Sequence, residues 1–244
     1  MPPRETAILI RNYIGGIGSV SGKFLHAQGA KLALLYAPFE ASRVKSAISE
    51  AYGSSSEDHV RPYECDITSP DSVSAAFDAI AKDAVAFPSI LLNAAGYVNL
   101  TPLESTPPED IMKHYMINLY GPTLTGQAFA RMYMSAKQQA GSSAAKPGRI
   151  VNVASQAAHV ALLHHGAYCA SKAGLIGLTK CQASEWGPHG ITANTISPGP
   201  VLTELGRKAW GDAKVQADYL TAVPTKVLAE PEVSDEVGLM WEWV

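Results

Sequence analysis

Three side chains near the middle of the chain have the types and spacing needed for proton transfer. Ser155 follows the apolar run 150–153, which predicts a buried strand. Tyr168 and Lys172 are four residues apart in a segment that continues as a helix, so the phenol and the ammonium share one helix face. A serine hydroxyl at the strand end could hold a carbonyl or alcohol oxygen beside that phenol.

The tyrosine needs help to act as a base. A free tyrosine has a pKa of about 10, so base catalysis at neutral pH requires surroundings that lower this pKa by about three units. The Lys172 cation could supply part of that change, because a nearby opposite charge favours the phenolate. The pair therefore predicts acid–base chemistry at an alcohol or carbonyl oxygen.

The elements that must position these residues alternate along the chain. Apolar runs predict strands at 6–10, 31–36, 59–65, 89–92, 149–153 and 192–196, with helical segments between them at 17–28, 40–52, 70–83, 109–139 and 167–186. This alternation predicts an α/β fold in three layers, a doubly wound parallel sheet with helices on both faces. The only loop-like stretch, 141–148, is too short to separate domains, so we expect one domain over 1–244.

Composition narrows the class of protein. A formal net charge of −3 gives no basic surface for nucleic acid. Cys65, Cys169 and Cys181 lack metal-ligand spacing, and a sparse, odd set is typical of a reducing compartment. There is no signal-peptide layout and no apolar run of membrane-spanning length. We therefore expect a soluble cytoplasmic protein with a small-molecule substrate, no metal, no nucleic acid and no membrane partner.

A glycine-rich turn, residues 11–18, follows the first predicted strand. Glycines there let the backbone approach a pyrophosphate, and the N–H groups and dipole of the next helix favour an anion. Asn12 tolerates positive φ better than most other residues. The turn therefore predicts a dinucleotide site, and a glycine turn that binds no ligand is the alternative.

Ser155 together with the Tyr168-Cys169-Ala170-Ser171-Lys172 run resembles the short-chain dehydrogenase/reductase family, over nearly the whole chain. The resemblance implies a Rossmann-type fold and hydride transfer between a nicotinamide cofactor and a secondary alcohol or ketone. It implies that Tyr168 exchanges the substrate proton, Ser155 polarises the substrate oxygen, and Lys172 lowers the tyrosine pKa and holds the ribose. Asn118 would anchor a relay water, with a structurally satisfied buried Asn as the alternative.

The resemblance also implies cofactor contacts in the loops after the strands. Of the family's TGxxxGxG turn, Gly16 and Gly18 are in place, while Arg11 and Asn12 replace the usual Thr and Gly. Asp66 matches the aspartate that contacts adenine, with a turn-stabilising carboxylate as the alternative. The implied cofactor-binding set is Asn12, Gly16, Ile17, Gly18, Tyr36, Asp66, Ile67, Asn93, Ala94, Gly96, Tyr168, Lys172, Pro198, Gly199, Val201 and Thr203.

The end of the second predicted strand bears on which cofactor is used. An acid there bonds a ribose 2′-OH, and none is present at Tyr36, Ala37 or Pro38. We therefore expect NADP, with NAD as the second candidate. Arg43 or Arg11 could approach a 2′-phosphate, and a solvated surface charge is the alternative for each.

Several features point to the substrate. His159, His164 and His165 lie between Ser155 and Tyr168, either as polar substrate contacts or as solvated loop residues, and nothing in their spacing favours a metal. With Gln156 they would make a polar pocket. The run 200–210 resembles that of polyol and sugar-alcohol dehydrogenases, and the segment 203–224 is expected to form a substrate loop over the site.

The last residues depart from the family pattern, because its final strand and glycine-rich tail have no counterpart after residue 240. We therefore expect the sixth strand to lie at a sheet edge. The resemblance implies a homo-oligomer, a dimer or tetramer, for which the helices 109–139 and 167–186 keep one family interface. Two alternatives remain open: a nucleotide sensor or scaffold of the same fold with weak catalysis, and a truncated chain that folds poorly.

Overall fold

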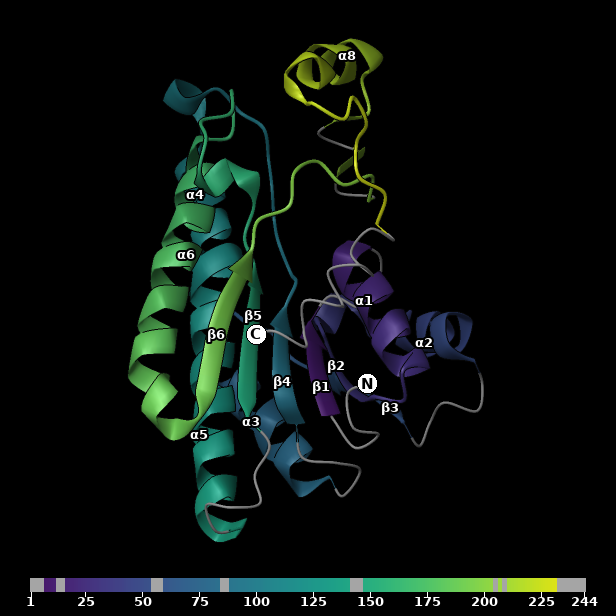
Figure 1. Ribbon diagram of the computed structural model, residues 1–244, viewed down its shortest axis with the longest axis vertical. Helices are drawn as coiled ribbons and strands as arrows, with labels where there is room; N and C mark the ends of the chain where they lie inside the picture. The colour runs from purple at the N-terminus through teal and green to yellow at the C-terminus, as the bar shows by residue number, and fades with distance from the viewer. Residues whose placement is uncertain are drawn as a thin grey trace.

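The fold is an open sheet of parallel strands. The computed structural model describes residues 7–11, 16–53, 59–83, 88–140, 147–203, 206–207 and 210–231. The sheet has six strands in the order β3-β2-β1-β4-β5-β6 (Figure 1). Their bounds are β1 Ala7–Arg11, β2 Lys31–Tyr36, β3 Val60–Glu64, β4 Pro88–Asn93, β5 Gly148–Val153 and β6 Ile191–Ile196. The strand order reverses between β1 and β4, the place where open parallel sheets bind ligands.

Helices cover both faces of the sheet. One face carries α1 (Gly16–Ala27) and α2 (Val44–Tyr52), and the other carries α3 (Pro70–Lys82), α5 (Gly121–Ala140) and α6 (Gly166–Trp186) (Figure 1). Each face has its own apolar cluster, with Leu25 and Ile48 in the first and Phe77 and Phe129 in the second. The three-layer, doubly wound fold predicted from the sequence is confirmed.

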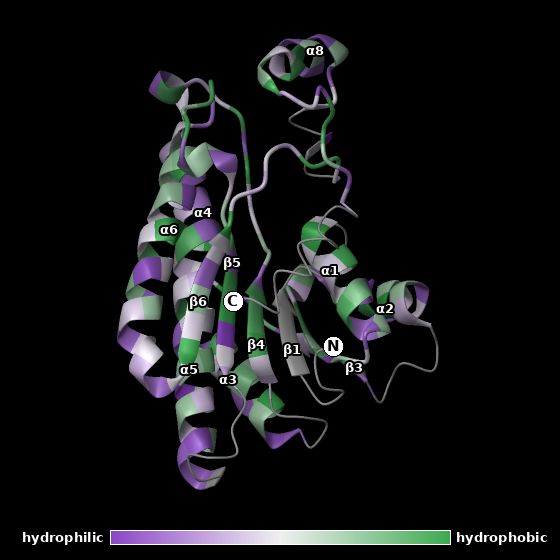
Figure 2. Cartoon of the chain, in the orientation of Figure 1, coloured by the Kyte–Doolittle hydropathy of each residue, from purple (hydrophilic) through white to green (hydrophobic). Residues whose placement is uncertain are grey.

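Strand sequence explains the double covering. In β2 the four central residues are buried, with Leu32 and Leu34 in the cluster under α1 and α2, and Ala33 and Leu35 in the opposite cluster. Successive side chains of a strand point to opposite faces, so a continuous apolar run requires cover on both. The strands β4 and β5 are also largely hydrophobic (Figure 2).

Local signals fix the helix ends. The Ser69 side chain accepts a hydrogen bond from Ser72 N at 3.3 Å and caps α3, and Pro70 occupies its first turn. Val73, Phe77 and Ile80 recur at helical spacing and are buried against the sheet. The predicted helix at 70–83 is therefore confirmed to within one residue.

Two predicted helices are wrong in detail. The segment 109–139 is not one helix: α4 (Pro108–Tyr115) is followed by a π-helical segment (Met116–Tyr120, labelled η3) and then by α5. A π turn adds one residue to a helical turn, which hydrophobic spacing does not reveal. The segment 40–52 begins with a 3₁₀ turn, η1 (Pro38–Glu40), and its helix α2 starts only at Val44.

The carboxyl ends of the strands carry the remaining elements. These are the short helices η2 (Leu103–Ser105) and η4 (Gln156–Ala158) and, farther out, α8 (Ala213–Ala222) (Figure 1). One further short helix, η5 (Gly187–His189), lies before β6. β6 lies at the edge of the sheet formed by the described strands. The expectation about a final strand falls on residues 232–244, which lie outside the described residues, as does Asn12. No helix in the described ranges is long and apolar enough to cross a membrane.

Candidate active site

An open cavity at the carboxyl ends of the central strands collects most of the predicted site residues. Its volume, including the mouth that is open to solvent, is about 890 Å³. The predicted residues that line it are Gly16, Ile17, Ala94, Gly96, Ser155, Tyr168, Lys172, Pro198, Gly199, Val201 and Thr203. Segments far apart in the sequence thus meet at one place.

Ser155 and Tyr168 form the polar centre of this cavity. Ser155 follows β5, and its Oγ accepts a hydrogen bond from Ala157 N at 3.1 Å. Tyr168, in the first turn of α6, lines the same cavity. Burial raises the pKa of Tyr168 above its usual value of 10.0, while the bond from Ser155 opposes that rise and Cys169 adds to it. Tyr168 is therefore protonated at neutral pH, the form that can give a proton.

Lys172 lies one helical turn after Tyr168 and is buried, with 3% of its surface exposed. Its Nζ donates a hydrogen bond to Val153 O at 2.7 Å and lies 5.8 Å from the centroid of the Tyr168 ring. A buried ammonium needs polar partners, and the carbonyl at the end of β5 is one of them. The Lys172 charge is thus held at the base of the cavity, behind the phenol.

Asn118 sits in the π-helical segment and is completely buried. Its Oδ1 accepts from Tyr97 N at 2.8 Å, and its Nδ2 donates to Tyr97 O at 2.9 Å and to Ser171 Oγ at 3.0 Å. A Cβ on Gly96 would lie 3.8 Å from Asn118 Oδ1 and 3.7 Å from Lys172 Nζ. The Asn118 amide thus has hydrogen-bond partners inside the protein, as in the alternative of a buried structural Asn. Asn118 also lies near Lys172. π turns are frequent at functional sites.

The start of α1 faces the same cavity. Gly16 has a φ of +73°, a conformation that favours glycine, and it lines the cavity together with Ile17. Neither residue presents a charged side chain, so the first N–H groups of the helix are open to a ligand. These features fit the pyrophosphate of a dinucleotide.

Five predicted cofactor residues do not line the cavity: Gly18, Tyr36, Asp66, Ile67 and Asn93. Asp66 Oδ1 accepts from Thr68 N at 2.9 Å and from Thr68 Oγ1 at 2.7 Å, so this carboxylate stabilises the turn after β3, the alternative left open by the sequence. The Ile67 side chain is core, packed against Gly121. Asn93 Nδ2 donates to Asn152 Oδ1 at 2.8 Å inside the protein.

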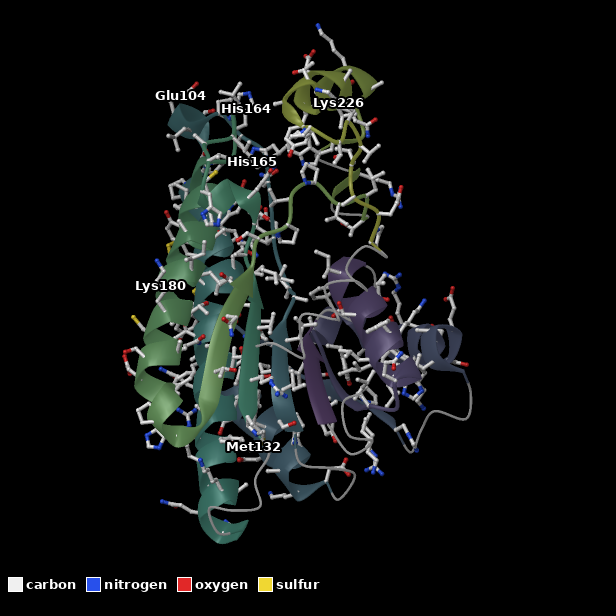
Figure 3. The ribbon with its side chains drawn as sticks, in the orientation of Figure 1. Glu104, Met132, His164, His165, Lys180 and Lys226 are labelled. Atoms are coloured by element: carbon white, nitrogen blue, oxygen red, sulfur yellow. The ribbon has the colours of Figure 1, made fainter. Side chains whose placement is uncertain are left out.

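The three histidines have different surroundings. His159 is exposed, and its Nε2 lies 3.1 Å from Ser197 Oγ. His164 is exposed at the loop tip, and His165 lies below it, toward the segment that leads to α8 (Figure 3). His165 is buried and lines the cavity. Among the described residues, no group of His, Cys, Asp and Glu side chains could hold a metal ion.

Two aromatic residues near the cavity were missed by sequence reasoning. Tyr219 on α8 donates a hydrogen bond to Gln156 Oε1 at 2.9 Å, directly beside Ser155. The Trp210 ring lies 4.5 Å from the Tyr219 ring and 6.4 Å from the His165 ring, between centroids. The clustering of aromatic residues after Pro198 was the available signal. These contacts link the expected substrate segment to the cavity.

Comparisons with known proteins agree with this geometry. The family model described as enoyl-(acyl carrier protein) reductase matches residues 14–240. D-threitol dehydrogenase of Mycolicibacterium smegmatis is 38% identical over 92% of this chain and 80% of its own length. NAD-dependent glycerol dehydrogenase of Listeria innocua is 33% identical (93% and 83%), and D-erythrulose reductase of Gallus gallus is 31% identical (88% and 79%).

A solved structure shows the same architecture. A short-chain type dehydrogenase/reductase from Mycobacterium marinum superposes with a TM-score of 0.84 at 27% identity, over 96% of this chain and 87% of that one. Together with the sequence matches, this shows that the chain belongs to the short-chain dehydrogenase/reductase family, whose members are NAD(P)-dependent oxidoreductases of CH–OH groups.

Proposed function

We propose that this protein transfers a hydride reversibly between a nicotinamide cofactor and a small polyol or the corresponding ketose. One observation carries the proposal: Ser155 and Tyr168 line one cavity together with Gly16 and Lys172. Two hydroxyls at one point can both donate to a substrate oxygen, and the helix start can hold a dinucleotide beside it.

The chain's own residues handle the proton. In ketone reduction, the substrate oxygen accepts hydrogen bonds from Ser155 and Tyr168, and Tyr168 gives its proton as negative charge develops on that oxygen. The high pKa of Tyr168 keeps the proton in place until then. Lys172 stabilises the phenolate that is left. Asn118 would anchor the relay water through which the proton returns.

The cofactor, when bound, supplies or accepts the hydride. Gly16 and Ile17 would hold its pyrophosphate through their N–H groups, and Lys172 would hold the nicotinamide ribose. Val201 and Thr203 also line the cavity and would orient the carboxamide. Thr203 Oγ1 also accepts a hydrogen bond from Gly206 N at 3.0 Å, which fixes this segment.

A polyhydroxy substrate fits the polar groups on the substrate side. His165 Nδ1 lies 2.7 Å from Leu163 O, and because a carbonyl only accepts, Nδ1 carries the proton and Nε2 is an acceptor for a substrate hydroxyl. Gln156 Oε1 accepts from Tyr219, so its amide N–H groups remain as donors. The relatives whose names specify threitol, glycerol and erythrulose support the same class.

For the cofactor we propose NADP(H), because the end of β2 carries no acid at positions 36–38 and Arg43 is exposed nearby. NAD(H) is the second candidate, and Glu40 is the observation that favours it. Glu40 Oε2 accepts a hydrogen bond from Ala37 N at 2.8 Å, which brings a carboxylate back to the strand end. Titration of wild type and Glu40→Gln with NADPH and NADH separates the two cofactor candidates. If the Glu40 carboxylate repels a 2′-phosphate, the NADPH dissociation constant should fall in Glu40→Gln.

The long helices α5 and α6 pack against each other on one sheet face (Figure 1). We propose that they also pair with a second copy of the chain, giving a dimer or tetramer. Light scattering of the purified protein measures this directly, and a monomer at micromolar concentration would contradict it.

The substrate proposal is tested with a panel of triols, tetritols, pentitols and their ketoses beside apolar secondary alcohols and ketones. Higher kcat/KM on the polyhydroxy compounds is expected. Turnover of only the apolar compounds would contradict the substrate class. Tight cofactor binding with no turnover on any compound would instead favour the sensor alternative.

A further inference from the structure

A buried histidine holds the loop between β4 and α4. His114, near the end of α4, is only 1% exposed. Its ring lies between two tyrosine rings, with centroids 4.8 Å from Tyr97 and 6.3 Å from Tyr168. α4 also packs against α6, which carries Tyr168 (Figure 1). A polar ring buried at this position must find partners for both nitrogens.

Those partners fix the protonation of the ring. His114 Nδ1 lies 2.7 Å from Asp110 O, which can only accept, so Nδ1 carries the proton. His114 Nε2 lies 3.1 Å from Asn99 N, which can only donate, so Nε2 carries the lone pair. One neutral tautomer satisfies both bonds. A second proton, on Nε2, would face the Asn99 N–H and break that bond.

The bond to Asn99 secures a loop on which the site depends. Two residues earlier, Tyr97 N and Tyr97 O both bond to the Asn118 amide. These are two of the three hydrogen bonds described above for Asn118. Gly96, the residue before, lines the cavity and lies beside Lys172 Nζ. Movement of this loop would therefore disturb Asn118 and the surroundings of Lys172 together.

Titratable groups face His114 from three elements. Tyr97 comes from the loop, Tyr168 from α6, and Asp110 and Lys113 from α4 itself. Asn99 Nδ2 and Tyr97 Oη both donate to the Asp110 carboxylate, and these bonds, with the nearby His114 and Lys113, lower the pKa of Asp110. Lys113 Nζ lies 4.3 Å from the Tyr97 ring centroid. The loop is therefore tied to α4 through the Asp110 carboxylate as well as through His114.

We propose that His114 is a positioning residue: neutral His114 holds the Gly96–Asn99 loop, and through it Asn118, in the arrangement that supports turnover. The inference rests on the proposed oxidoreductase function, since turnover is what the positioning serves.

Two variants separate the hydrogen bonds from the packing of the ring. In His114→Phe an aromatic ring stays and both bonds are lost, so kcat is expected to fall about tenfold, the loss that one neutral hydrogen bond of ordinary strength corresponds to. In His114→Gln an amide oxygen can still accept from Asn99, so this variant is expected to keep most of the wild-type kcat. His189→Gln, at the exposed η5 turn, is the matched control and should keep the wild-type kcat.

A second measurement needs no turnover. Long-range ¹H–¹⁵N correlation of wild type and His114→Gln assigns the His114 signals, which should show Nδ1 protonated and Nε2 bare at neutral pH. Amide exchange at Asn99 should be faster in His114→Phe than in wild type, because the acceptor for this N–H is lost. If wild type turns over none of the polyols or ketoses, the proposed function fails, and this measurement still tests the role of His114. Wild-type kcat in His114→Phe, unchanged exchange at Asn99 in that variant, or a bare Nδ1 would overturn the inference.

Discussion

The two walls of the cavity are built differently. On the catalytic wall, Asn118 and Lys172 are buried and bonded to neighbouring strands, loops and helices. The other wall, called here the α8 wall, includes residues that precede α8, from Pro198 to Trp210. α8 itself has no buried residue. The Tyr219–Gln156 hydrogen bond joins α8 to η4, and the bridge between Val201 and Ala229 joins the segments before and after α8.

The difference separates chemistry from selectivity. A proton donor must be held within hydrogen-bond reach of one oxygen, which the buried network achieves. A segment with little buried surface can change shape at low cost, so it can open for the substrate and close over it. We therefore expect changes on the catalytic wall to reduce kcat and changes on the α8 wall to act mainly on KM.

The largest effect is expected at Tyr168. Tyr168→Phe removes the proton donor and should lower kcat by about 10²–10⁴-fold, while cofactor titration gives a nearly unchanged dissociation constant. The matched control is Tyr52→Phe on α2, which does not line the cavity. Its hydroxyl is buried and has no hydrogen-bond partner among the described residues. Retained turnover in Tyr168→Phe would remove the phenol from the mechanism.

The ionisation of Tyr168 gives the next test. Without cofactor, burial favours the neutral phenol, so Tyr168 should ionise only above pH 10.0, the ordinary pKa, and stay protonated below it. The difference in phenolate absorbance between wild type and Tyr168→Phe measures this. Because the bond from Ser155 lowers the pKa, Ser155→Ala should move the ionisation to still higher pH. Ionisation near neutral pH would show that the Lys172 charge outweighs burial.

Packing under the catalytic wall predicts a loss of stability. A Cβ on Gly121, at the junction of the π segment and α5, would lie 1.9 Å from Ile67 Cδ1, a side chain that is 1% exposed. Gly121→Ala should therefore lower the free energy of unfolding by about 1–3 kcal/mol, as overpacking does in filled cores. Gly177→Ala on α6, where nothing lies within 4 Å, is the control and should be neutral or stabilising. Chemical denaturation compares the two, and equal stabilities would refute the tight contact.

The smallest effect is expected on the α8 wall. Tyr219→Phe removes the hydrogen bond to Gln156 and leaves the ring in contact with Trp210, at an interplanar angle of 58°. A partly exposed neutral bond contributes ~1 kcal/mol, so KM should rise about two- to tenfold with little change in kcat. Steady-state kinetics on the best ketose separates the two constants. A fall in kcat alone would mean that α8 positions the reacting groups.

Sequence predicted the fold and the catalytic wall because both are encoded locally. Apolar strands alternate with capped amphipathic helices, and Tyr168 and Lys172 share a helix face by spacing alone. The π turn at Asn118 was missed because hydrophobic spacing does not reveal one extra residue in a helical turn. The roles of Asp66 in its turn, and of Glu40 at the β2 end, depend on hydrogen bonds that spacing does not specify. The contacts of α8 could not be predicted either, because they also depend on side-chain bonds between distant segments.

The most direct test of the account follows the hydride itself. Wild-type protein is mixed with reduced nicotinamide cofactor carrying two deuterium atoms at carbon 4, together with the best ketose of the panel, and the product is analysed by mass spectrometry. The account predicts a polyol with one deuterium on the reduced carbon, formed by wild type and nearly absent with Tyr168→Phe. Cofactor binding without any deuterated polyol, across the whole panel, would contradict it.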